Sequence, residues 1–169
     1  MRGIKTILHV IDIISLTTGK IVSFLVIAMV GVTVYEVVMR YVFGAPTIWA
    51  FEMNYLMFGA YAILGGAYTL YLKGHVNVDI LYGRLSIRGK AISDLATFVF
   101  FLIFSGLLLW KVGELAWDSL MIRERLSSAW APPVYPLKLI MFVGVVLLLL
   151  QGLAKFIRDL TIAITGGER

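Results

Sequence analysis

The 169-residue sequence contains no cysteine, two histidines and four prolines. Without cysteine, the chain cannot form a disulfide framework, an iron–sulfur cluster or a thiol-based zinc site. The two histidines, His9 and His75, flank no common apolar run, so bis-histidine haem ligation is not expected. The sequence also lacks a phosphate-binding loop, a nucleophile–base pair and paired catalytic acids, so we expect neither an enzyme nor a cofactor.

Charged residues are scarce, at 15% of the chain, whereas 60% of the residues are hydrophobic and the mean hydropathy is +0.93. This composition is too apolar for a soluble globular domain. The net charge of +5 does not indicate nucleic-acid binding, because the basic residues lie beside apolar runs and form no patch interleaved with aromatics. We therefore expect the lipid bilayer as a partner, and no nucleic acid.

Four runs contain no charged residue, at 21–35, 53–72, 95–110 and 139–154. A helix needs roughly 17–25 residues to cross a bilayer core of about 30 Å, and each run reaches that length with an uncharged or snorkelling flank. We predict an all-α integral membrane protein that forms a single four-helix membrane domain over residues 1–169. Its transmembrane helices are expected at about 17–39, 50–72, 92–112 and 135–156.

The segment 4–16 is predicted as an N-terminal interfacial helix that leads into the first span. It carries His9 and Asp12 among apolar residues and lacks a basic head and a small-residue cleavage site, so it does not have the pattern of a cleavable signal. Its apolar positions are too many for a sharply amphipathic face. A simple extension of the first transmembrane helix is therefore an open alternative.

Basic residues are distributed unevenly among the connections. The two termini and the second connection carry ten lysines and arginines, whereas the first and third connections carry five. Positively charged loops stay on the cytoplasmic side, so we expect both termini in the cytoplasm and the first and third connections outside.

Two acidic residues near the first connection are candidates for function. Glu36 lies inside the first apolar stretch, where a carboxylate is a functional candidate by default, but Arg40 follows four residues later on the same helical face and favours a structural ion pair. Trp49 and Glu52 stand at the entrance of the second span. They suit an aromatic anchor and a helix-start acid, or a contact with a neighbouring membrane subunit.

The second span carries small residues at helical spacing, Gly59, Ala62 and Gly66. Such a stripe lets another helix approach closely, either within this chain or from a partner subunit. After this span, His75 and Asp79 would share a helical face, but two ligands do not make a metal site, so we expect a structural hydrogen bond and no metal.

The third connection combines charge with proline. Arg123, Glu124 and Arg125 lie in it, and Pro132, Pro133 and Pro136 follow. Because proline stops helices and stiffens loops, we expect the chain to turn here and the fourth span to begin near Tyr135.

The segment 40–81 resembles the small membrane subunit of tripartite ATP-independent periplasmic (TRAP) transporters, the DctQ family. The resemblance rests on the run Arg40-Tyr41-Val42-Phe43-Gly44, on the spacing of Pro46, Trp49 and Glu52, on the glycine-rich second span, and on His75-Val76-x-Val78-Asp79 after Gly74. The motif-bearing part covers about a quarter of the chain, and the remainder matches in layout only.

The resemblance implies a non-catalytic scaffold in the cytoplasmic membrane of a bacterium or archaeon. It implies a large membrane subunit of the DctM type that holds the substrate and sodium sites, and a periplasmic substrate-binding protein of the DctP type that delivers an organic acid. Residues that would seat helices or contact the large subunit are Arg40, Trp49, Glu52, Gly59, Ala62 and Gly66. The cytoplasmic motif would be Gly74, His75 and Asp79, and Arg123, Glu124 and Arg125 would help to dock the binding protein.

Two other classes of function remain open at this point. A small homo-oligomeric proton-coupled exporter could use Glu36, since such chains also have four spans with an acid in the first one. A membrane anchor of a respiratory enzyme is the other alternative, although the missing histidine pair disfavours it.

Overall fold

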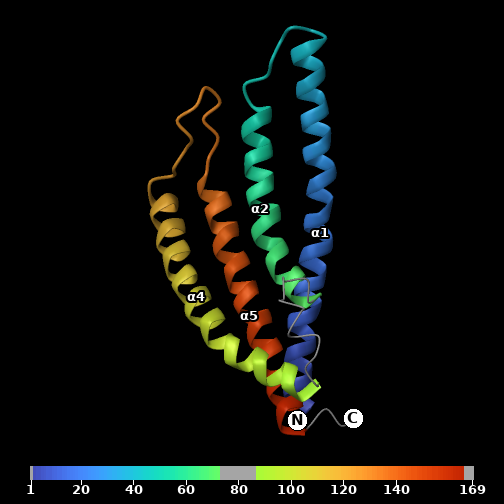
Figure 1. The fold of residues 1–169 in the computed structure, drawn as a ribbon. Coiled ribbons are helices and arrows are strands. Elements are labelled where there is room, and N and C mark those ends of the chain that lie inside the picture. Colours follow the sequence, from blue (N-terminus) through green and yellow to red (C-terminus); the bar gives the residue numbers. More distant parts are fainter. Residues whose placement is uncertain (1, 73–86, 166–169) are drawn as a thin grey trace.

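A computed structural model describes residues 2–72 and 87–165 of the chain. The described ranges contain four helices: α1 (Arg2–Tyr41), α2 (Ala50–Tyr71), α4 (Ile87–Met121) and α5 (Tyr135–Thr165) (Figure 1). The prediction of an all-α membrane protein is confirmed.

The first connection and the start of α5 follow directly from local sequence. Gly44 adopts a φ of +63°, a left-handed conformation that glycine accepts without strain, and it follows the end of α1. Pro46 comes two residues later, where the chain has already left the helix. At the other connection, α5 begins at Tyr135 with Pro136 in its first turn, as predicted.

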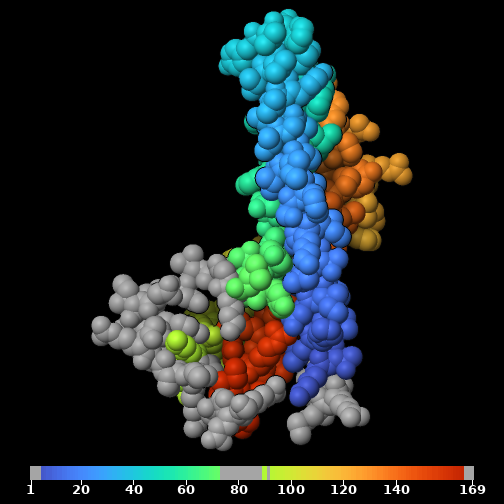
Figure 2. All heavy atoms as spheres, turned by 90° about the vertical axis from the view of Figure 1, so that its right-hand side faces the viewer, coloured from blue at the N-terminus to red at the C-terminus, as the bar shows by residue number. Residues whose placement is uncertain are grey.

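The helices lie side by side in a single layer, in the order α1, α2, α5, α4 (Figure 1). The neighbouring pairs pack along their length, and α1 and α5 also touch to a smaller extent. The start of α1, the start of α4 and the end of α5 lie at one end of the layer. Viewed from the α1 edge, α1 runs the whole length of the molecule, with residues near 125–145 visible on one side (Figure 2).

Close packing inside this layer depends on small residues. Gly19 lies so near Tyr68 that a Cβ atom would come 2.2 Å from the ring, and Gly152 has the same relationship to Phe101. Gly144 faces Ile63 of α2. Small residues at helix contacts allow the backbones to approach, which gains dispersion energy that lipid chains would not supply.

Within the part of the chain that the structure describes, three helices are long and apolar enough to cross a membrane, over Lys5–Tyr41, Ile92–Met121 and Tyr135–Thr165. The second predicted span, α2, is not among them. Its 22 residues are about 33 Å long and could reach across the core, but Glu52, Asn54 and several tyrosines make it more polar. Four transmembrane helices are thus not confirmed, and a span at α2 stays a prediction.

The separate N-terminal interfacial helix is not confirmed either. α1 runs without interruption from Arg2 to Tyr41, which matches the alternative of an extended first helix. Forty helical residues span about 60 Å, more than the 40–45 Å of a bilayer with its headgroups. An untilted α1 would therefore project beyond the membrane.

Candidate interaction sites

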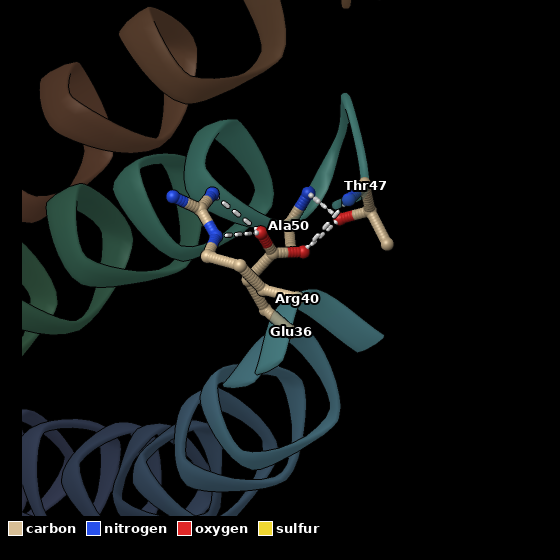
Figure 3. A network of polar contacts seen from close by, with 4 residues as sticks. All are labelled: Glu36, Arg40, Thr47 and Ala50. Carbon is tan, nitrogen blue, oxygen red and sulfur yellow. Dashed lines mark hydrogen bonds and ion pairs between the residues drawn. The ribbon is translucent and has the colours of Figure 1, made fainter. Parts of the chain in front are cut away.

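Glu36 holds the first connection against the end of α1 (Figure 3). Its Oε1 accepts hydrogen bonds from Arg40, at 3.0 Å from Nε and 2.6 Å from Nη2. Its Oε2 accepts from the Thr47 amide at 3.0 Å and from the Thr47 hydroxyl. The Thr47 oxygen in turn accepts from the amide of Ala50 at 3.3 Å, so one carboxylate joins α1, the loop and the start of α2.

This arrangement favours the structural role that the spacing of Glu36 and Arg40 indicates. A carboxylate that carries protons must be able to release its hydrogen-bond partners in each cycle. The Glu36 carboxylate instead accepts hydrogen bonds from four donor groups on two residues. The sequence did not predict that Thr47 donates hydrogen bonds to this carboxylate. The only signal in the sequence is that a hydroxyl residue lies three positions before the start of α2.

Trp49 and Glu52 occupy different environments at the entrance of α2. Trp49 stacks on Tyr35 of α1, with ring centroids 5.8 Å apart and an interplanar angle of 28°. Glu52 lies in the first turn of α2, where the helix dipole favours an acid, but its Oε2 is buried and has no hydrogen-bond partner among the residues that the structure describes. Glu36 differs in this respect, because both of its carboxylate oxygens accept hydrogen bonds.

The small residues of α2 divide between two surfaces. A Cβ atom on Gly59 would lie 3.2 Å from Leu137 of α5, and one on Gly66 would lie 3.9 Å from Leu148 of the same helix. Both glycines therefore face α5 inside this chain. Ala62 is exposed, on the open face of α2 that also presents Phe51 and Phe58.

A polar cluster that the sequence did not predict joins α1 to α5. The Ser15 hydroxyl donates to Gln151 Oε1 at 2.9 Å, and Gln151 Nε2 donates to Asp12 Oδ1 at 3.1 Å. Arg158 Nη2 then donates to Asp12 Oδ2 at 2.6 Å. Ser15 and Gln151 are almost completely buried, so their mutual hydrogen bond satisfies groups that lipid could not.

A second ion-pair cluster joins α5 to α4. Lys155 Nζ lies 2.6 Å from Asp94 Oδ2 and 2.9 Å from Asp159 Oδ2. Gln151, Lys155 and Arg158 follow each other at helical spacing on α5, and this periodicity was the available signal for a polar face. The partners on α1 and α4 could not be assigned from it.

The third connection folds into a small hairpin over residues 122–134. Arg125 and Pro133 form an isolated antiparallel bridge, and the Leu126 amide donates to the Pro132 carbonyl at 3.0 Å. Arg123 and Ala131 both have a φ of +47°, which marks the tight turns. The prediction of a turn in this connection is confirmed.

The three predicted docking residues of this loop behave differently. Arg123 and Arg125 are both exposed, but Arg125 also donates from Nη1 to the carbonyl of Ala131 at 3.2 Å. Glu124 pairs with Lys138 at the start of α5, and this ammonium partner lowers the pKa of the Glu124 carboxyl below its ordinary value of 4.5. The side chain of Arg123 is therefore the most available of the three.

The predicted cytoplasmic motif of Gly74, His75 and Asp79 lies outside the described residues. Within the ranges that are described, no group of three or more histidine or acidic side chains could hold a metal ion.

The fold and these sites define a multi-pass helical membrane protein whose polar side chains mainly join its own helices. Residues 29–162 match the family described as "Tripartite ATP-independent periplasmic transporters, DctQ component". The chain belongs to this family, whose members are components of transporters and not enzymes, and it is therefore a small permease subunit of TRAP type in the inner membrane.

The chain is also similar to a curated protein of Vibrio cholerae serotype O1, named "C4-dicarboxylate TRAP transporter small permease protein DctQ". The two are 30% identical over 110 residues, which are 65% of this chain and 45% of that protein. The match thus spans about half the length of the relative.

Proposed function

We propose that this chain is a non-catalytic scaffold for a large, sodium-coupled permease subunit of the DctM type, in a system that takes up an organic acid. The observation that carries the proposal is the single layer of helices. A substrate site near the membrane midplane is usually built from broken helices that enclose polar groups. Here the described helices are continuous, and Asp12 with Arg158 and Asp94 with Lys155 form ion pairs between helices.

The contact with the large subunit is proposed at the outer half of α2. Ala62 lies on an open face with Phe51 and Phe58, where a second helix could pack closely. The unpartnered oxygen of Glu52 supports a polar contact nearby. Arg40, Trp49, Gly59 and Gly66 hold this region in shape, since each contacts another part of this chain.

The outer hairpin is proposed to help dock a periplasmic substrate-binding protein of the DctP type. This role requires the predicted orientation, with both termini cytoplasmic and residues 122–134 outside. The start of α1 and the end of α5 lie at one end of the layer and the hairpin lies at the other, as this role requires, and the excess of basic residues in the termini and the second connection is the argument for which end is cytoplasmic (Figure 1). Arg123 is the residue whose charge is best placed to meet an acidic side chain of the binding protein.

Reconstitution tests the scaffold role. Vesicles that contain this chain alone should take up no organic acid. Vesicles that contain the chain, its large subunit and the binding protein should accumulate the acid when a sodium gradient is applied. Uptake by the chain alone, or equal uptake by the large subunit without it, would contradict the proposal.

A further inference from the structure

An apolar groove of about 620 Å³ runs between α1, α2, the start of α5 and the 122–134 hairpin. Its size lies within the range of about 300–1,000 Å³ found for ligand sites. Aliphatic side chains of three helices form the walls, including Val22, Leu56 and Ile140, and the hairpin closes one end with Trp130 and Pro132.

Arg125 is the one charged residue among the described residues that line this groove. It spends one of its five N–H donors on the carbonyl of Ala131, and the structure pairs it with no carboxylate in the described ranges. The groove therefore combines apolar walls with one cation, a chemistry that suits an amphipathic anion.

The depth of the groove matches a lipid that stands in the bilayer leaflet at the hairpin end of the layer. The hairpin joins the end of α4 to the start of α5, so Arg125 belongs to the surface region of the membrane. The α2 wall extends from Met53 to Leu64, eleven residues further along the helix, which is about 16 Å. A ligand with its headgroup at Arg125 would thus have its chain in the hydrocarbon core.

We propose that this groove binds one phospholipid of the surrounding bilayer, with an acyl chain between α1, α2 and α5 and the headgroup phosphate at Arg125. A free phosphate would leave the apolar part of the groove unfilled, and a helix of another protein would leave Arg125 with no anion unless it brought an acid. The bound lipid fills the groove on the side of the helix layer that the hairpin covers. This inference rests on the groove and does not depend on the transport role.

Trp130 provides the probe, because it lines the groove. The full chain with Trp49, Trp110 and Trp117 changed to Phe is purified in detergent and titrated with phosphatidylglycerol that carries brominated acyl chains, which quench tryptophan fluorescence. Quenching of Trp130 should saturate near one lipid per chain. Brominated phosphatidylcholine, whose headgroup has no net charge, should bind more weakly, and inorganic phosphate should not displace either lipid.

Two variants separate this site from lipid that coats the protein. Arg125→Gln should weaken phosphatidylglycerol binding about fivefold, as expected for one basic side chain at an anionic headgroup, whereas Arg123→Gln in the same hairpin should leave it unchanged. Ala60→Phe should fill the groove and remove the saturable quenching. Thermal melting of each variant reports whether it is folded.

Three outcomes would overturn the proposal. Quenching that rises without saturation and is equal in wild type and Ala60→Phe would show coating lipid only. Equal affinity of Arg125→Gln and wild type for phosphatidylglycerol would remove the headgroup assignment. Displacement of the brominated lipid on addition of the large subunit would show that a protein helix occupies the groove.

Discussion

Asp12 and Arg158 are 146 residues apart in the chain, yet they form an ion pair with an N–O distance of 2.6 Å between α1 and α5. Gln151 binds the other oxygen of the same carboxylate. Helices in lipid gain little from apolar association, since lipid chains are as apolar as leucine, so such polar links help to determine which helices are neighbours.

Removal of this link should destabilise the layer. Arg158→Leu leaves Asp12 with one partner in a partly buried position, and we expect a loss of about 1–3 kcal/mol and a lower Tm in detergent. Lys111→Gln, which breaks the exposed pair with Glu114, is the control and should change the stability little. Equal Tm values for wild type and Arg158→Leu would show that the pair contributes nothing. Asp12→Asn combined with Arg158→Leu should cost less than the sum of the single changes, because both variants remove the same interaction.

Gly19→Ala should be poorly tolerated although alanine is the better helix former. The new methyl group would lie 2.2 Å from the Tyr68 ring, so α1 and α2 would have to separate. We expect a loss of about 1–3 kcal/mol from overpacking. On the same helix, a Cβ atom on Gly31 would meet no described neighbour within 4 Å. Gly31→Ala should therefore leave the Tm unchanged or raise it slightly. A similar response at both positions would contradict the close α1–α2 contact.

Substitutions in α2 distinguish internal packing from subunit contact. Gly59→Leu places a side chain against Leu137 of α5 and should lower the Tm of the isolated chain. Ala62→Leu, on the exposed face, should leave that Tm unchanged but reduce co-purification with the large subunit, because overpacking at the subunit contact costs about 1–3 kcal/mol. Full recovery of the complex with Ala62→Leu would show that this face contacts lipid.

The Glu124–Lys138 pair should make the 122–134 hairpin sensitive to acid. Because the pKa of Glu124 is lowered in the folded protein, its ionised form stabilises the fold at any pH above the ordinary value of 4.5. This contribution should decrease as the pH falls below 4.5 and disappear once the pH passes the lowered pKa. We expect the Tm difference between wild type and Glu124→Gln to be largest near neutral pH and to vanish in acid. A difference that is constant with pH would mean that the carboxyl does not ionise in this role.

Arg123→Glu should slow uptake when the binding protein is dilute, because an exposed charge at a docking surface acts mainly on the association rate. The effect should shrink at high salt and at high binding-protein concentration, and the complex of the two membrane subunits should form normally. Arg123→Lys, which keeps the charge, is the control. Wild-type uptake by Arg123→Glu across a titration at low salt would exclude a role in docking.

Features that depend on neighbours in the sequence were accessible without the structure. Three of the four charge-free runs coincide with described helices that are long and apolar enough to cross a membrane. Pro132, Pro133 and Pro136 indicated that a turn precedes a helix at Tyr135. The pair of Glu36 and Arg40 also followed from its spacing, because residues four apart on a helix lie on one face. The full length of α1 could not be predicted from the sequence, because helix propensity does not show where a membrane-spanning segment ends and its extension begins.

Features that join distant segments were decided only by the tertiary structure. The sequence contains Asp12, Asp94, Lys155 and Arg158, but periodicity states only which residues share a helix face and not which helix that face meets. The placement of α2 between α1 and α5 directs Gly59 and Gly66 inward, leaves Ala62 open, and forms the groove that Arg125 reaches from the hairpin. Composition determined that the chain enters a membrane, because the free energy of transferring apolar residues into a bilayer depends on residue type. Interhelical packing and ion pairing determined which surfaces remain open to lipid or a partner.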